Sequence, residues 1–349
     1  MPAIIIDPTV NIQYSSFYIK GLEIVFGKVN VRFSSKYFKS LKRQKERNSY
    51  EHYMAFVLVD KDCLTKYVID FRDKVEVKES AYDWCDKYAK INYHKRYTGS
   101  RFSSKMISIP PGFGIRIWGL WETIFYGISN FAKCNFSPVT SGKQFFADYF
   151  LLYLRRLPIE GYSKNDQLKE YESMESKENY VFFISTLWPH ENCLKTTNVL
   201  RKHFIETCKN FQFIDFEGGF YANSSHPQYE EFKQIVFTKP YSVKSYLDKT
   251  KASLFVFNTP SVHNCHGWKL GEFLAMGKAI ISTPLSNELP EALVHGKNIH
   301  IISDFSKLEE TVRLIVKNKK YRQHLEVGAK AYYLKYVKPE SVIRYILNY

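Results

Sequence analysis

Short apolar runs alternate with helical patterns twice along this chain, and a polar stretch separates the two series. The first series has apolar runs at 3–7, 53–59, 67–71 and 106–109. Residues 163–179 then contain almost no aliphatic side chain, which is typical of a connecting segment. Strands that alternate with helices form parallel sheets covered by helices on both faces. The sequence therefore predicts an α/β protein with two Rossmann-like, doubly wound domains.

The length of 349 residues suits two domains, because single cores stop growing at about 250–300 residues. We place an N-terminal domain at 1–170, a C-terminal domain at 180–337 and a last helix at 338–349. Apolar residues at helical spacing predict two further helices in the first half, at 116–133 and 141–157. In the second half the same analysis predicts strands at 180–185, 211–216, 234–238, 253–258, 279–282 and 299–302, and helices at 197–208, at 269–276 and from 306.

The net charge of +15 requires an acidic partner, and nucleic acid, anionic lipid and sugar diphosphates all qualify. The sequence contains neither a zinc-finger spacing nor an RNP-like aromatic motif, so we expect no nucleic-acid partner. The six cysteines lack the spacing of a disulfide framework, and no secretory signal is recognisable. These features predict a cytoplasmic protein. His and Cys spacing does not fit a structural zinc site, so no metal is expected.

The segment 263–284 carries the clearest functional signal. A glycine-containing loop leads into a short helix that stops at Gly277, and an apolar strand follows. Such an arrangement puts a helix N-terminus beside the carboxyl ends of parallel strands, where its amides favour a phosphate. His266, Gly267 and Trp268, followed by Lys269, form the predicted phosphate-binding loop. Glu272, one turn later, could accept from two ribose hydroxyls or simply satisfy the helix dipole.

The run from Gly271 to Pro284 (GEFLAMGKAIISTP), with ELPE from Glu288 and HGKN from His295, resembles the donor-binding region of GT-B glycosyltransferases of the group 1, family 4-like kind. The resemblance extends from about residue 180 to the C-terminus; over the first half it is only architectural. It implies two Rossmann-like domains that face a cleft, a last helix that returns to the N-terminal domain, and no bound metal or cofactor.

Retaining members of that superfamily carry a Glu-x7-Glu motif whose second glutamate binds the donor ribose. Glu272 matches the second position, whereas Asn264 stands at the first, which leaves the retaining or inverting outcome open. The resemblance also implies a basic side chain on the donor diphosphate, after the first strand of the C-terminal domain. In the loop from Thr186, Lys195 is our first candidate and Arg201 the second. The loop containing Tyr241 corresponds to the site of the donor base.

An inverting enzyme also needs a base on the N-terminal domain to deprotonate the acceptor hydroxyl. Asp70 and Asp73 directly follow an apolar run and are the strongest candidates, ahead of Asp7 and Asp60. An ordinary Asp–Arg surface turn is the alternative interpretation.

A basic cluster and an aromatic helix predict peripheral contact with the anionic inner face of a membrane. Core packing explains the aromatic residues equally well. The cluster consists of Lys36, Lys39, Lys42, Arg43, Lys45 and Arg47, and the aromatic residues are Trp118, Trp121, Phe125 and Tyr126.

Together these features predict a glycosyltransferase that moves a sugar from a nucleoside-diphosphate-sugar donor to a glycan or lipid-linked saccharide, in cell-surface polysaccharide synthesis. Two alternatives share the architecture: a nucleotide-sugar 2-epimerase, and a catalytically silent protein that binds nucleotide sugars or glycans.

Overall fold

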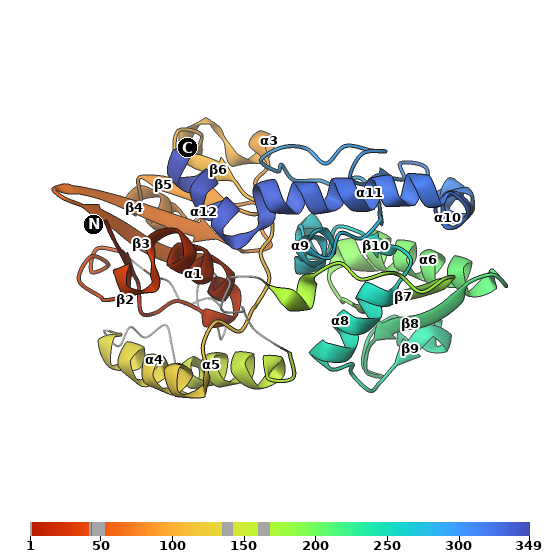
Figure 1. The fold of residues 1–349 in the computed structure, drawn as a ribbon, viewed down its shortest axis with the longest axis horizontal. Coiled ribbons are helices and arrows are strands. Elements are labelled where there is room, and N and C mark those ends of the chain that lie inside the picture. Colours follow the sequence, from red (N-terminus) through yellow and green to blue (C-terminus); the bar gives the residue numbers. More distant parts are fainter. Residues whose placement is uncertain (1, 42, 44–52, 135–141, 160–167) are drawn as a thin grey trace. The chain divides into compact units, whose positions relative to one another are not determined.

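A computed structural model describes residues 2–41, 43, 53–134, 142–159 and 168–349 (Figure 1). The chain forms two compact units. The first consists of Met1–Glu170, Glu288–Pro290 and Tyr336–Tyr349, and the second of Tyr171–Asn287 and Glu291–Lys335. Each unit is an α/β domain with its own sheet, as the sequence predicts.

The first unit is built on a six-stranded sheet in the order β2-β1-β3-β4-β5-β6. All neighbouring strands are parallel except at β3, which runs antiparallel to both β1 and β4. The strands are β1 (Ala3–Ile6), β2 (Val31–Phe33), β3 (Tyr53–Asp60), β4 (Cys63–Asp70), β5 (Lys87–Lys90) and β6 (Met106–Ser108).

The β3–β4 hairpin corrects the sequence prediction of a wholly parallel sheet. Only Lys61 and Asp62 separate the two strands, and Lys61 has a positive φ of 52°. A parallel crossover needs a dozen or more residues, whereas two residues suffice for a hairpin. The short connection, rather than the apolar pattern, therefore sets the strand direction.

The last helix of the chain packs in the first unit, against α1. A Cβ atom on Gly21 of α1 would lie 2.4 Å from the carbonyl oxygen of Pro339, at the start of α12. This close backbone approach requires glycine at position 21. The helices of this unit are α1 (Ile12–Phe26), α2 (Glu79–Trp84), α3 (Lys95–Thr98), α4 (Leu120–Lys133), α5 (Gly142–Arg156) and α12 (Pro339–Asn348).

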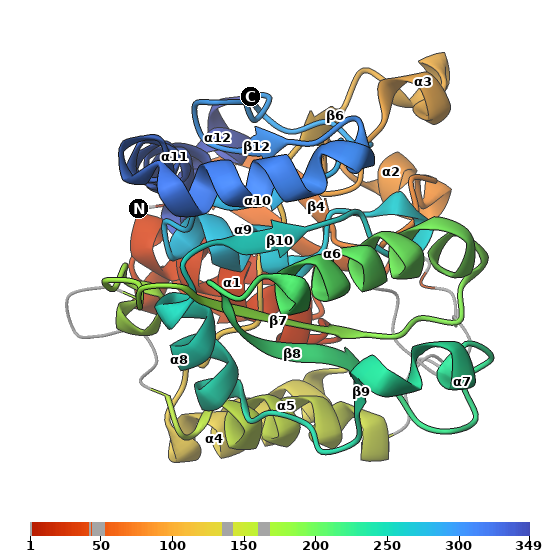
Figure 2. The same cartoon turned by 90° about the vertical axis from the view of Figure 1, so that its right-hand side faces the viewer.

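The second unit contains two three-stranded parallel ladders, β7-β8-β9 and β10-β11-β12. They lie side by side at β7 and β10 (Figure 2), where the amide of Leu254 donates to the carbonyl of Tyr180 at 2.7 Å. The resulting order, β9-β8-β7-β10-β11-β12, is that of a doubly wound Rossmann sheet. The strands are β7 (Tyr180–Thr186), β8 (Asp215–Tyr221), β9 (Val236–Phe237), β10 (Val256–Asn258), β11 (Ile280–Ser282) and β12 (His300–Ile301).

Helices cover this sheet around a core rich in phenylalanine. Phe204 of α6 stacks on Phe257 of β10 with ring centroids 4.2 Å apart, and both rings are buried. This packing fixes α6 beside the central strands. The helices are α6 (Asn198–Asn210), α7 (Tyr229–Phe232), α8 (Val243–Ala252), α9 (Trp268–Ala275), α10 (Leu308–Lys317) and α11 (Lys319–Tyr332).

Within the described ranges, no helix is both long and apolar enough to cross a bilayer.

Candidate anion-binding site in the second unit

The carboxyl ends of β7 and β10 form the edge where ligands are expected in this sheet. The strand order reverses between these two strands, and in open α/β sheets ligands bind at that switch point. β7 ends at Thr186 and β10 at Asn258, and α9 begins at Trp268. The loops that follow the two strands therefore shape the site.

Asn192 links these two loops. Its amide nitrogen donates to the carbonyl oxygen of Ser261 at 2.9 Å and to Oδ1 of Asn264 at 3.2 Å, and its Oδ1 accepts from the amide of His263 at 3.3 Å. His263 and Asn264 both have left-handed backbone conformations, with φ of 54° and 56°. Consecutive left-handed residues other than glycine are strained and persist where their surroundings hold them. The hydrogen bonds of Asn192 supply that support.

Arg201, on α6, points a buried guanidinium at this edge. Its Nη1 donates to Oγ of Ser185 at 2.7 Å and its Nε to Oγ1 of Thr259 at 2.9 Å. Both partners are neutral hydroxyls, and the side chain is only 7% exposed. Burial lowers the pKa of Arg201 to about 10, which still leaves it charged at neutral pH.

Lys269 places a second cation at the same edge. From the first turn of α9, its Nζ donates to the carbonyl oxygen of Ile184, near the end of β7. It also lies over the rings of Phe183 and Tyr246, at 5.5 and 5.8 Å from their centroids. Burial, and secondly the charge of Arg201, lower the pKa of Lys269 to about 7.

In the described part of the chain, no carboxylate forms an ion pair with Arg201 or Lys269. A buried charge is costly unless it is paired. Gly267, the N-cap of α9, offers no side-chain cap, and a Cβ at Gly267 would meet no atom within 4 Å. A buried guanidinium and a half-buried ammonium beside an uncrowded helix start form a site suited to an anion with several negative oxygens.

Glu272 lies one turn into α9 and is 5% exposed. Its Oε1 accepts from the hydroxyl of Tyr171 at 3.1 Å and its Oε2 from that of Tyr246 at 2.8 Å. Burial and the neighbouring Glu272 raise the pKa of Tyr246 well above its usual value. The two tyrosine hydroxyls therefore orient the carboxylate of Glu272.

His266 and Asn264 hold the predicted phosphate-binding loop in place. His266 is buried, and burial lowers its pKa to about 4, so the imidazole is neutral. Its Nε2 lies 3.0 Å from the carbonyl oxygen of Asn287 and carries the proton, because a carbonyl only accepts. The amide of Asn287 in turn donates to the carbonyl of Asn264 at 3.2 Å. His266 therefore contributes position rather than charge.

Lys195 and Arg201, the two predicted diphosphate ligands, lie in different surroundings. Lys195 lies in the turn before α6, in an exposed ion pair with Glu191 at 2.7 Å, whereas Arg201 is buried at the sheet edge. Thr186 is exposed at the end of β7. Tyr241 donates to Oε1 of Glu217 at 3.0 Å, and burial raises its pKa to about 12. The structure thus gathers Arg201, Lys269 and Glu272 on the elements of one sheet edge, and gives Lys195 and Tyr241 other partners.

Ser185, Thr259 and Asn192 are the site residues that the sequence did not reveal. Thr259 is 58 positions from Arg201 along the chain. No local pattern marks a hydroxyl as the partner of so distant a guanidinium. The position of Ser185 and Thr259 at the ends of β7 and β10 is the signal that could have identified them.

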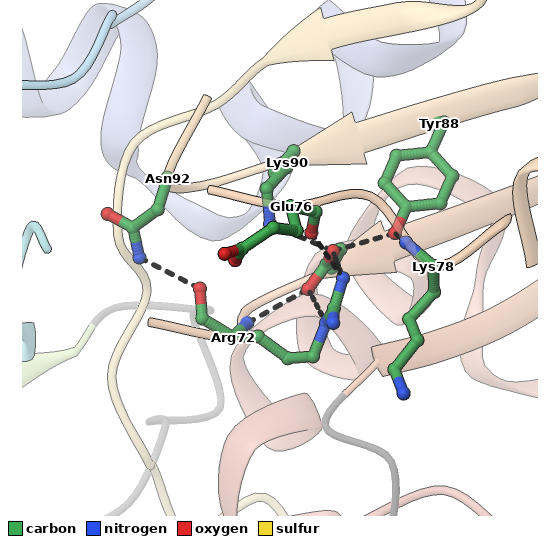
Figure 3. A network of polar contacts seen from close by, with 7 residues as sticks. Arg72, Glu76, Lys78, Tyr88, Lys90 and Asn92 are labelled. Carbon is green, nitrogen blue, oxygen red and sulfur yellow. Dashed lines mark hydrogen bonds and ion pairs between the residues drawn. The ribbon is translucent and has the colours of Figure 1, made fainter. Parts of the chain in front are cut away.

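In the first unit, the carboxylate of Asp70 is the centre of a buried polar network, and Figure 3 labels its partners Arg72, Tyr88 and Lys90. Its carboxylate accepts from Arg72 at 2.7 and 3.0 Å, from Lys90 at 2.9 Å and from the hydroxyl of Tyr88 at 2.7 Å. Although burial opposes ionisation, the charges of Lys90 and Arg72 hold the pKa of Asp70 well below its usual range. A fully buried carboxylate with these partners is unsuited to the predicted role of base, whereas Asp73 is exposed.

Arg43, predicted to belong to a basic membrane-binding cluster, is buried instead. Its guanidinium pairs with Asp7 at 2.6 Å and covers the ring of Tyr53 at 4.4 Å. Lys36 and Lys39 are exposed, while Lys42, Lys45 and Arg47 fall outside the described residues. Arg43 therefore stabilises the unit rather than facing solvent.

No protein-family model and no curated protein matches the chain. Among solved structures, TarM is 15% identical with a TM-score of 0.41, and the match covers 75% of this chain and 50% of TarM, so this chain spans half of that protein's length. A glycosyltransferase from Rickettsia africae is 10% identical, with a TM-score of 0.43 and coverages of 80% and 69%. MnaA of S. aureus, solved with UDP, is 11% identical, with a TM-score of 0.39 and coverages of 80% and 74%.

These solved structures include a glycosyltransferase, the class that the sequence resemblance predicts. Among the described residues, no three His, Cys, Asp or Glu side chains are grouped as metal ligands.

Proposed function

We propose that this protein is a glycosyltransferase that binds a nucleoside-diphosphate-sugar donor at the carboxyl ends of β7 and β10. The observation that supports this proposal most directly is the pair of basic side chains there, the buried Arg201 and the half-buried Lys269, which form no ion pair with a carboxylate of the described chain. A diphosphate supplies the missing negative charge, and the open start of α9 adds backbone amides.

The same cations suit the chemistry of transfer. In that reaction the bond between the anomeric carbon and the diphosphate oxygen breaks, and its electron pair stays on the oxygen. The acceptor hydroxyl forms the new bond and loses its proton to a base. Fixed positive charge stabilises the developing diphosphate, because it is already oriented before the reaction begins. Arg201 and Lys269 are held for this role by Ser185, Thr259 and the carbonyl of Ile184.

For the donor ribose we propose Glu272, whose two oxygens are oriented by tyrosine hydroxyls. For the acceptor we propose a glycan or lipid-linked saccharide of cell-surface polysaccharide synthesis, used at the inner membrane face. With Asp70 enclosed in its network, Asp73 is the remaining strand-end carboxylate from the predicted pair. We keep it as the candidate base.

Calorimetric titration of the full chain with UDP, GDP, ADP, CDP and TDP tests the donor site. We expect one of these nucleotides to bind to the wild type. It should bind at least tenfold more weakly to Arg201→Met and to Lys269→Met, because charge-assisted hydrogen bonds contribute about 1.5–3 kcal/mol each. Lys278→Met is the matched control. Lys278 is also buried in the second unit, but it donates to Ser176 and to the carbonyl of Lys251. Unchanged affinity in all three variants would contradict the proposal.

A further inference from the structure

The helices α4 and α5 of the first unit both carry apolar side chains on their outward faces. α4 buries Thr123, Gly127 and Asn130, while Trp121, Phe125 and Ile128 are 80, 64 and 60% exposed. Residues three and four apart share a helix face. The small and polar face of α4 therefore packs against the protein, and its aromatic face is turned outward.

The neighbouring helix also turns apolar side chains outward. α5 packs beside α4, and its Leu151 and Leu154 are 41 and 58% exposed, as is Leu157 just beyond its end, at 48%. Its inner face is mixed, because it buries Phe145, Tyr149 and Leu152 together with Asp148 and Arg156. Asp148 accepts from Asn11 at 3.1 Å and from Gln144 at 2.9 Å.

Scattered exposed apolar residues are ordinary, but a contiguous apolar surface marks an interaction site. We propose that the outward face of α4 and α5, formed by Trp121, Phe125, Ile128, Leu151, Leu154 and Leu157, binds the surface of an anionic bilayer. This inference specifies the membrane contact of the proposed function, and the donor site takes no part in its test.

The charges around this face favour an anionic membrane as its binding partner. The exposed side chains of Lys133 at the end of α4, and of Lys143 and Arg155 on α5, accompany the apolar residues. The whole chain carries a net charge of +15. Basic residues attract anionic headgroups, and Trp and Phe favour the boundary between headgroups and acyl chains. α4 is a helix of 14 residues, which suits a position in the plane of the interface rather than across it.

Trp118 and Tyr126, which the sequence analysis grouped with Trp121 and Phe125, do not belong to this face. Trp118 is 5% exposed and stacks on Tyr126 with centroids 4.4 Å apart. The predicted aromatic cluster thus divides into an inner pair that packs in the unit and an outer pair that is available to lipid.

Co-sedimentation of the full chain with vesicles tests the proposal. We expect binding to phosphatidylcholine vesicles that contain phosphatidylglycerol, weakened by high salt. The triple variant Trp121→Gln/Phe125→Gln/Ile128→Gln should bind at least tenfold more weakly while keeping the wild-type melting temperature, because all three positions are exposed. The matched control is Val199→Gln/Leu314→Gln/Val327→Gln, which replaces three exposed apolar residues of the second unit and should bind as the wild type does.

Tryptophan quenching locates the contact. Brominated lipid should quench the wild type and have much less effect on Trp121→Phe. Equal vesicle binding by both triple variants would overturn the proposal. A second result would also overturn it: the wild type is a dimer that fails to bind vesicles, and the triple variant of α4 is a monomer. In that case a second copy of the chain would cover the face. Nucleoside diphosphate affinity should be the same in every variant of this series. Failure of vesicle binding therefore leaves the donor site untouched, and failure of nucleotide binding leaves this inference untouched.

Discussion

In the first unit, Arg72 and Lys90 lie buried at the carboxyl ends of β4 and β5 and share the carboxylate of Asp70 (Figure 3). In the second unit, the buried Arg201 and the half-buried Lys269 lie at the corresponding edge of the other sheet, against hydroxyls, a carbonyl and aromatic rings. The two sites contain the same pair of side-chain types. In the first site both cations pair with a carboxylate, whereas no carboxylate of the described residues forms an ion pair with either cation of the second.

This difference separates a structural ion network from a candidate binding site. Removing one partner of a buried ion pair is strongly destabilising, because the charge that remains is left unpaired. The network of the first unit is therefore expected to contribute to stability. In the second unit, no described carboxylate forms an ion pair with either cation, and Glu272 acts on Lys269 only through its nearby charge, so we expect a bound external anion to offset the cost of the buried charge.

The largest effect is expected for Asp70→Ala, which leaves Arg72 and Lys90 without their carboxylate. Breaking a buried pair in this way costs about 3–5 kcal/mol, so urea unfolding at neutral pH should show a large loss of stability. The exposed Asp83, 3.8 Å from Arg101, provides the control, since Asp83→Ala should change stability by less than about 0.5 kcal/mol. Similar losses in both variants would remove the distinction between buried and exposed pairs.

The pH dependence of stability follows from the same carboxylate. The pKa of Asp70 lies well below its usual range, so its stabilising contribution is fully present above the ordinary aspartate pKa of about 3.9 and is lost as the pH falls through the folded-state value. The wild type should lose more stability on acidification than Asp70→Asn does. Parallel urea midpoints for the two proteins between pH 6 and pH 2 would contradict this.

Glu272→Ala is expected to have the next largest effect, and it changes both stability and binding. The hydroxyls of Tyr171 and Tyr246 lose this acceptor, and each such loss costs about 1–3 kcal/mol. Glu272→Gln keeps acceptor capacity for the tyrosines and separates the two roles. With the preferred nucleoside diphosphate, Glu272→Gln should reduce the preference for ribose over 2′-deoxyribose, and an unchanged preference would count against ribose binding.

Arg201→Met should affect stability differently from Asp70→Ala, because the loss of the Arg201 charge does not leave a carboxylate unpaired. We expect the free energy of unfolding without ligand to hold or rise, whereas nucleoside diphosphate affinity falls at least tenfold, which is about 1.4 kcal/mol. Loss of stability comparable to that of Asp70→Ala would show that Arg201 is mainly structural.

The sequence alone indicates α9 and the loop before it as the candidate site, but it could not choose among the basic residues nearby. The stop of α9 before Gly277, with φ of 61°, follows from local rules, and so does the series of strands in the second unit. The burial of Arg201 depends on Ser185 and Thr259, which come from two different strand ends. Likewise, periodicity predicts α4 as a helix but cannot say that Thr123 and Asn130 face inward, because that depends on what the helix packs against.

Lys269 should make anion binding depend on pH. Its pKa is lowered from the ordinary value of 10.5 to about 7, and a bound diphosphate favours the charged form. Above pH 7, binding should therefore take up a proton, and affinity should decrease as the pH rises. Without ligand, the unfolded chain holds this proton between about pH 7 and 10.5 while the folded chain does not, so this group makes stability rise with pH in that window. Titration in two buffers of different ionisation enthalpy should show proton uptake in the wild type and none in Lys269→Met.

The smallest effect is expected for Lys195→Ala, and it sharpens the comparison because sequence resemblance ranked Lys195 first among the diphosphate ligands. Lys195 is 72% exposed on its side chain and pairs with Glu191, which is 78% exposed. Exposed pairs of this kind contribute about 0–1 kcal/mol, so the melting temperature should hardly change. The exposed ammonium of Lys195 contacts water, so a contact with an anion adds little to its binding free energy. The guanidinium of Arg201 is buried away from water, so the same contact contributes more. Nucleoside diphosphate affinity of Lys195→Ala should therefore stay within about twofold of the wild type, a change of roughly 0.4 kcal/mol. A tenfold loss measured by calorimetry would mean that the turn before α6 reaches the ligand, and that burial alone does not identify the residues that bind it.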